Sequence, residues 1–266
     1  MLGGVFGGQI ILFALFALIT AGCLWELTGL LVAEEEYKIL RRVLGTFFGT
    51  FVYVFLSLSF ILILYEEDQA FFRMVLIIIG FSTFIIELFL NPKQPFANIG
   101  YYLLGAVYVG LPFALLQDIA APEYRWCLNI GEYYPLRVLG LLLLIWTNDT
   151  MAYFVGSQLG KRKLFERISP KKTWEGTIGG GLCTVLIAWG LSFLIKDFTV
   201  TQWLALGAVA AVFGTLGDLV ESMLKRSVGV KDSGNLLPGH GGLLDRFDAF
   251  IFALPFYWLT LMLLKG

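Results

Sequence analysis

The residues best suited to chemistry in this sequence gather in residues 217–248, GDLVESMLKRSVGVKDSGNLLPGHGGLLDRFD. This stretch holds five carboxylates, four basic side chains and the only histidine of a chain that is otherwise strongly apolar. Carboxylate oxygens are suitable ligands for a hard cation, and basic side chains with a glycine-rich backbone suit phosphate groups. We therefore expect the functional centre of the protein in this stretch.

The spacing within this stretch predicts two helices joined by a loop. Four residues fall at i, i+3, i+4 and i+7, so a helix would place them on one face: Asp218, Glu221, Ser222 and Lys225. The following SGNLLPGHGG cannot continue a helix and favours a tight loop with an exposed backbone. Asp245 and Asp248 then lie three residues apart where the next apolar run begins.

Residues 222–248, SMLKRSVGVKDSGNLLPGHGGLLDRFD, resemble the signature of the phosphatidate cytidylyltransferases, also called CDP-diacylglycerol synthases. The resemblance is carried by polar, glycine and proline positions: Ser222, Lys225, Arg226, Lys231, Asp232, Pro238, His240, Gly241, Gly242, Asp245, Arg246 and Asp248. It extends to WTNDTMAY at 146–153 and SPKKTWEG at 169–176, whereas the N-terminal half is similar only in being hydrophobic. The resemblance implies a nucleotidyltransferase of phospholipid biosynthesis that converts CTP and phosphatidate to CDP-diacylglycerol and pyrophosphate.

The composition indicates an integral membrane protein. Of the 266 residues, 58% are hydrophobic and only 15% are charged, against about 25% charged residues in a soluble domain. Apolar runs long enough to cross a bilayer lie around 9–32, 43–65, 71–90, 98–117, 136–156, 174–195, 202–224 and 247–265. We expect an all-α, polytopic membrane bundle of about eight transmembrane helices, in which Pro112 and several glycines interrupt the fourth helix.

We treat residues 1–266 as one transmembrane domain, with N-terminal helices in 1–135 and catalytic helices and cytoplasmic loops in 136–266. Members of the resembled family usually begin with a short basic segment and one more helix. We expect either that this helix is lacking or that residues 1–8 are its remnant.

The basic residues predict the topology. Most of the 19 lysines and arginines fall in alternate connections, which the positive-inside rule assigns to the cytoplasm. The two richest connections, 157–173 and 225–246, are too short to fold as separate nucleotide-binding domains, and the sequence has no GxGxxG or GxxxxGK[ST] motif. We expect the site at helix ends and in short loops on the cytoplasmic side, in the simplest case of a bacterial inner membrane.

Carboxylates at membrane depth need a compensating partner, because each costs about 2.5–3.5 kcal/mol to insert. Asp149, Asp218 and Glu221 lie in predicted membrane helices. Either a lysine or arginine of a neighbouring helix pairs with them, or they face a polar cavity that holds a divalent cation. Oxygen ligands without clustered histidine or cysteine favour Mg²⁺. We expect Asp218 and Asp245 as its main ligands, with Glu221 and Asp248 in support, and leave a second cation open.

The connection 161–172, KRKLFERISPKK, is strongly basic. For Lys161, Arg162 and Lys163 we favour contact with anionic lipid headgroups. Thr173 is expected to cap the next helix, where free N–H groups beside Lys171 and Lys172 would suit a phosphate.

The roles that follow combine these patterns with the resemblance. The residues assigned to catalysis are Asp218, Asp245, Lys225, Lys172 and Asp149. The residues assigned to substrate binding are Ser169, Lys171, Ser222, Arg226, Lys231, Asp232, His240, Gly241, Gly242 and Arg246. For His240 a structural role stays open, and for Gly241 and Gly242 a simple turn is the alternative to close approach of a ligand.

Four other residues are expected to serve the fold. Gly176 and Gly180 are four residues apart and favour close helix packing. Glu26 and Glu87 are expected to mark helix ends or inter-helix bonds, without chemistry.

The expected partners are CTP, phosphatidate and membrane lipid, with no nucleic acid and with a homodimer left open. Two alternative functions remain. One is a CTP-dependent kinase of a polyprenol or other lipid alcohol, and the other is a cation-coupled transporter, because membrane carboxylates also mark ion pathways.

Overall fold

A computed structural model describes residues 2–32, 37–62, 66–90, 93–121, 132–234 and 241–264. The chain forms two compact units. The first consists of Met1–Tyr133 and Asp232–Leu244, and the second of Tyr134–Lys231 and Asp245–Gly266. Residues 232–244, the loop within the signature (the signature loop), therefore belong to the same unit as the N-terminal helices, although they follow α9 (Val200–Ser227) of the second unit in the sequence.

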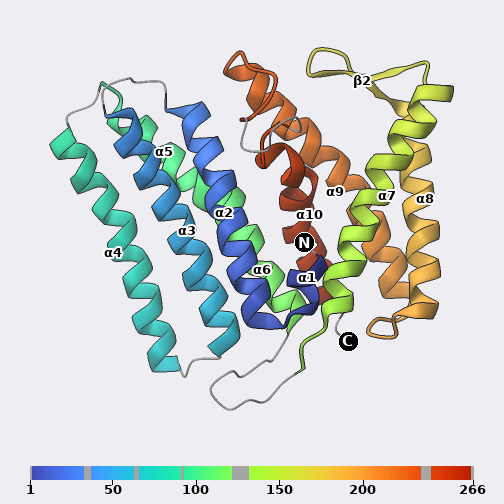
Figure 1. Ribbon diagram of the computed structural model, residues 1–266, viewed down its shortest axis with the longest axis horizontal. Coiled ribbons are helices and arrows are strands. Elements are labelled where there is room, and N and C mark those ends of the chain that lie inside the picture. Colours follow the sequence, from blue (N-terminus) through green and yellow to red (C-terminus); the bar gives the residue numbers. More distant parts are fainter. Residues whose placement is uncertain are drawn as a thin grey trace. The chain divides into compact units, whose positions relative to one another are not determined.

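Helices make up the first unit (Figure 1). They are α1 (Leu2–Phe6), α2 (Gln9–Leu31), α3 (Lys38–Leu62), α4 (Glu66–Leu90), α5 (Pro95–Gly105), η1 (Ala106–Gly110) and α6 (Leu111–Ala120). Helix α3 is central, because it packs against α2, α4, α5 and α6. A buried carboxylate links three of these helices: Glu87 of α4 accepts hydrogen bonds from Asn98 and Tyr102 of α5 and lies 3.8 Å from Nε of Arg41 of α3. These contacts confirm the inter-helix role expected for Glu87.

The interrupted fourth apolar run is one span with a π-helical turn in its middle. Helix α5 continues through η1 into α6, so that Pro95–Ala120 forms a 26-residue apolar segment. Pro112 is the second residue of α6, directly after the π-helical turn. Gly110, the last residue of η1, packs so closely on α3 that an added Cβ would lie 2.6 Å from the carbonyl oxygen of Gly49.

The second unit combines helices with one small hairpin. Its elements are α7 (Pro135–Leu159), β1 (Lys163–Phe165), β2 (Ser169–Thr173), α8 (Trp174–Leu194), α9 (Val200–Ser227) and α10 (Leu244–Leu263). Helix α7 packs against α8 and α9, and α8 packs against α9. The antiparallel strands pair Lys163 with Thr173 and Phe165 with Ser169, and they connect the end of α7 to the beginning of α8 (Figure 1).

The helices confirm the expectation of an all-α polytopic membrane protein. In the described part of the chain, seven helical segments are long and apolar enough to cross a bilayer, and each overlaps one of the predicted apolar runs. The predicted run at 71–90 lies in α4, where the apolar part, Met74–Leu90, is shorter. Large apolar side chains on these helices are exposed, among them Leu18 at 74% and Phe89 at 82%. Such surfaces suit a lipid environment rather than water.

Glycines bring α7 and α8 into close contact. An added Cβ at Gly176 would lie 2.6 Å from the carbonyl oxygen of Ala152, and one at Gly180 would lie 2.8 Å from the Cβ of Ala152. The packing role expected for both glycines is confirmed. This seam matters for function, because α7 and α8 carry the two ends of the hairpin.

We expect Gly180→Ala to destabilise the second unit by roughly 1–3 kcal/mol, because the new methyl group would press against the backbone of α7. Gly190→Ala is the matched control in the same helix, since nothing lies within 4 Å of an added Cβ there. Thermal unfolding in detergent measures both variants. Equal midpoints for the two would contradict the packing assigned to the seam.

Candidate functional site

The four residues predicted to share a face of α9 form two contacts between side chains one helical turn apart. The hydroxyl of Ser222 donates to Oδ1 of Asp218 at 3.3 Å, and Nζ of Lys225 lies 2.5 Å from Oε2 of Glu221. Both pairs are four residues apart, as a shared helical face requires. The placement of these four residues on one face is therefore confirmed.

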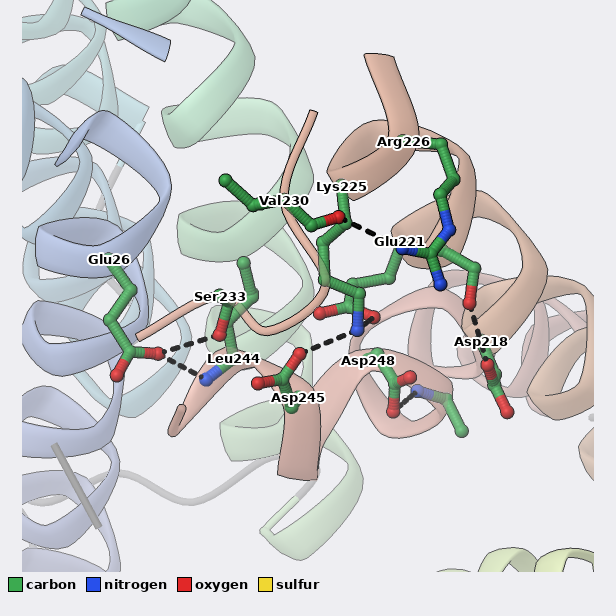
Figure 2. A network of polar contacts seen from close by, with 12 residues as sticks. Glu26, Asp218, Glu221, Lys225, Arg226, Val230, Ser233, Leu244, Asp245 and Asp248 are labelled. Carbon is green, nitrogen blue, oxygen red and sulfur yellow. Dashed lines mark hydrogen bonds and ion pairs between the residues drawn. The ribbon is translucent and has the colours of Figure 1, made fainter. Parts of the chain in front are cut away.

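Lys225 also connects α9 to α10. Its Nζ lies 2.6 Å from Oδ1 of Asp245, in the first turn of α10, as Figure 2 shows. The side chains of Glu221, Asp245 and Lys225 are 1%, 14% and 12% exposed. One largely buried ammonium group thus faces two largely buried carboxyl groups.

A second lysine joins the hairpin to α9. Nζ of Lys172, in β2, lies 2.6 Å from Oδ2 of Asp218. Asp149 of α7 and Asp248 of α10 interact electrostatically with both of these residues. Three carboxyl groups from three helices therefore interact with Lys172. Asp248 also accepts a hydrogen bond from the backbone N–H of Ala249 at 2.7 Å.

The base of the hairpin is held by α8. Thr173 caps α8, because its hydroxyl accepts a hydrogen bond from the N–H of Gly176 at 3.2 Å, as the sequence predicts. The carboxylate of Glu175, in the first turn, accepts from the N–H groups of Lys161 and Arg162 at 3.0 Å and 3.1 Å. The N–H of Trp174 donates to the carbonyl oxygen of Arg162. These bonds hold the start and the end of the hairpin on one helix end.

A pocket of about 430 Å³ opens between the hairpin and helices α7, α8 and α9. Its polar lining consists of Asn148, Asp149, Tyr153, Ser157, Lys163, Lys171, Lys172, Thr173, Thr177, Thr215 and Asp218. Three lysines from the hairpin face two carboxylates from the helices, so the pocket offers cations for an anionic ligand and oxygen ligands for a metal. Asn148 supports the wall by donating to Oγ1 of Thr215 at 3.1 Å.

The structure brings together part of the predicted site. Asp149, Lys171, Lys172 and Asp218 line the pocket, and Glu221, Lys225 and Asp245 form the buried group beside it in the same unit. Ser169 lies at the start of β2 and is half-buried. In the described residues no group of three histidine, cysteine or carboxylate side chains is arranged to hold a metal ion. Asp218 and Asp245 instead each contact a lysine, so the metal stays a prediction.

Other predicted residues have different surroundings. Arg226 donates to the carbonyl oxygen of Val230 at 3.1 Å, next to the end of α9. Lys231, Asp232 and Arg246 are exposed. His240 lies outside the described residues.

The two predicted loop glycines, Gly241 and Gly242, have backbone conformations or surroundings that favour glycine. Gly241 has φ +82°, a conformation that favours glycine. Gly242 is buried, and an added Cβ would lie 2.6 Å from Oε2 of Glu26. The close approach at Gly242 is therefore to a protein side chain.

Sequence reasoning missed three contributors. Lys163 lines the pocket, although its position in a basic run indicated a lipid anchor. Glu175 fixes the hairpin through backbone bonds. Glu26 makes the expected inter-helix bond, to the first residue of α10, but its contact with Ser233 of the signature loop was not foreseen.

The comparisons agree with the resemblance. The sequence model of the Cytidylyltransferase family matches residues 1–264. The phosphatidate cytidylyltransferase of Bacillus subtilis is 42% identical over 170 residues, 63% of this chain and 60% of that protein. The Staphylococcus aureus protein of that name is 39% identical over 182 residues, 68% of this chain and 65% of that protein. The Staphylococcus epidermidis protein is 37% identical over 206 residues, 75% of each chain. The chain thus matches less than two thirds of the length of the first two relatives.

We expect Lys225→Met to destabilise the protein by about 3 kcal/mol, because it leaves two largely buried carboxylates without their shared cation. Lys196→Met is the control. Lys196 is exposed, donates to the carbonyl oxygen of Ser192 and lies over the ring of Phe193, so its loss should shift the unfolding midpoint little. Equal shifts for the two variants would contradict the central place given to Lys225.

Proposed function

This chain belongs to the Cytidylyltransferase family, and from that premise we propose that it transfers the cytidylyl group of CTP to phosphatidate. The products are CDP-diacylglycerol and pyrophosphate. The names of the relatives support this substrate pair. The observation that carries the proposal is the pocket in which Lys163, Lys171 and Lys172 face Asp149 and Asp218.

The reaction suits a site built of charges. The phosphate of phosphatidate is already an anionic nucleophile, so no serine or cysteine has to be activated. Its oxygen forms a bond to the α-phosphorus of CTP, while the bond from that phosphorus to the oxygen bridging to the β-phosphate breaks and pyrophosphate leaves. The main barrier is the approach of two polyanions, and positioned cations lower it by neutralising phosphate oxygens.

The lysines of the hairpin and α9 have distinct roles in this proposal. Lys163 and Lys171 bind phosphate groups in the pocket. Lys172 and Lys225 neutralise charge next to the reacting phosphates, because they already lie among the carboxylates of α9 and α10. Arg226 and Lys231 lie near the end of α9 and draw the nucleotide toward the pocket.

The carboxylates fit a magnesium ion by their charge and donor atoms. Asp149, Asp218 and Asp248 interact with Lys172, and Glu221 and Asp245 contact Lys225, so each of these lysines has more than one carboxyl group near it. Carboxylate oxygens are the ligands that Mg²⁺ prefers, and phosphates and waters commonly complete its coordination. We propose Asp218 and Asp245 as the main ligands, with Glu221 and Asp248 in support. When bound, the ion supplies charge neutralisation at the phosphates of the nucleotide.

The site is proposed to face the cytoplasm of a bacterial inner membrane. The basic hairpin would then lie on the side that the positive-inside rule predicts. Phosphatidate could reach the pocket with its acyl chains in the bilayer, while CTP arrives from water. The kinase and transporter alternatives gain no support from the relatives named above.

A product assay tests the proposal. The purified protein in detergent is given phosphatidate, labelled CTP and Mg²⁺, and we expect CDP-lipid and pyrophosphate. Asp218→Asn and Asp245→Asn should lower turnover about 100-fold or more, as loss of a charge-stabilising group does. Lys93→Ala should change little. CDP with a new phospholipid would indicate the kinase instead, and unchanged turnover in both asparagine variants would remove the metal assignment.

A second assay separates the pocket from the basic run. Lys163→Ala should raise the KM for CTP about 10-fold, because it removes one charged phosphate contact. Lys161→Ala is the matched control, since Lys161 belongs to the same basic run but its side chain does not line the pocket. If both variants raise the KM equally, the effect of Lys163 reflects general surface charge rather than the pocket.

A further inference from the structure

The carboxylate of Glu26, in the C-terminal part of the apolar helix α2, contacts residues toward both ends of the signature loop, Ser233 and Leu244 (Figure 2). Its Oε2 accepts a hydrogen bond from the hydroxyl of Ser233 at 3.1 Å and one from the N–H of Leu244 at 2.8 Å. Glu26 is 2% exposed, Ser233 is 5% exposed and Leu244 is fully buried. A single buried oxygen therefore joins α2 to two positions of the first unit that lie 207 and 218 residues farther along the sequence.

The loop is packed closely on this carboxylate. An added Cβ at Gly234 would lie 2.6 Å from Oε1 of Glu26. One at Gly242 would lie 1.9 Å from the hydroxyl oxygen of Ser233 and 2.6 Å from Oε2 of Glu26. Because both glycines leave room only for the carboxylate and the serine, the backbone on either side of the loop is adapted to Glu26.

The bond to Leu244 has a particular consequence. Leu244 is the first residue of α10, and its N–H is one of the helix-terminal donors that lack a partner within the helix. An anionic acceptor at that end is favourable and fixes where the helix begins. Asp245 is the next residue of the same helix, and its carboxylate contacts Lys225.

We propose that Glu26 is a positioning residue for cytidylyl transfer, which holds both ends of the signature loop and thereby sets the first turn of α10, from which Asp245 projects. The inference rests on the proposed function. Glu26 would act on the reaction by positioning Asp245 through Leu244, without contacting the substrate itself. Misplacement of a reacting group by about 1 Å can lower a rate 100-fold. We therefore expect kcat to fall when the contacts of Glu26 with Ser233 and Leu244 are removed.

Glu87 provides an internal comparison. It is also a buried glutamate of an apolar helix in the first unit, at 1% exposed. Its partners are Asn98, Tyr102 and Arg41, all in membrane helices. If burial of a carboxylate served only helix packing, the two glutamates would behave alike.

The experiment compares four variants of the full chain in detergent: Glu26→Leu, Glu26→Gln, Ser233→Ala and Glu87→Gln. Leucine fits an apolar helix but cannot accept either bond, so we expect kcat to fall about 30-fold with the protein still folded. Glutamine keeps one oxygen that can accept both bonds and should stay within about fivefold of the parent. Glu87→Gln should lower the unfolding midpoint yet leave kcat within about twofold below that temperature.

Two further readouts separate positioning from general stability. Ser233→Ala should lower kcat about fivefold alone and not at all in the Glu26→Leu background, because both changes remove the same hold. Hydrogen exchange of peptides covering 241–248 should be faster in Glu26→Leu than in Glu87→Gln. Three results would overturn the proposal. The first is a kcat of Glu26→Leu within about threefold of the parent. The second is a double variant whose loss of kcat equals the product of the two single losses, and the third is hydrogen exchange of peptides 241–248 that is unchanged in Glu26→Leu.

The same experiment distinguishes the two proposals. An intact protein that forms no CDP-lipid removes the proposed function, whereas hydrogen exchange still decides whether Glu26 holds the start of α10. Activity in the parent with unchanged exchange in Glu26→Leu removes the role of Glu26 alone.

Discussion

The structure of the second unit depends on one constraint: carboxylates in membrane helices require cations close by. Lys225 satisfies Glu221 of its own helix and Asp245 of the next, so it ties α9 to α10. Lys172 reaches Asp218 from the hairpin and so ties β2 to α9. Each lysine joins two elements. The same contacts therefore compensate the buried carboxyl groups and bring them together at or beside the pocket. The ion pairs that stabilise this unit therefore also hold the candidate site together.

Local patterns predicted much of this arrangement. Hydropathy over about twenty residues is enough to locate membrane helices, and the runs it indicated agree with the helices. The shared face of Asp218, Glu221, Ser222 and Lys225 follows from helical spacing alone, and the cap at Thr173 follows from its place before an apolar run. These features depend on residues within one or two helical turns of each other, so a sequence without structure shows them.

The remaining features depend on contacts that no local pattern reveals. Glu26 lies 207 residues from Ser233 and 218 from Leu244, and a lone glutamate in an apolar run is equally suited to many partners. The hairpin was hidden by its charges, because three basic residues at its start fit a lipid anchor as well as a strand. The π-helical turn at Ala106–Gly110 appeared in sequence only as an interruption. Which lysine meets which carboxylate is decided by helix packing, which spacing along one helix cannot show.

The base and the tip of the hairpin differ in how they are held. Glu175, Trp174 and Thr173 hold the base on α8, whereas Glu166 and Arg167 at the turn are exposed and do not line the pocket. Exposed loop tips are where changes in length are best accommodated. Across relatives, evolutionary insertions and deletions should therefore collect at the turn. The same position offers a site for a fluorescent label that leaves the lysines of the strands unmodified.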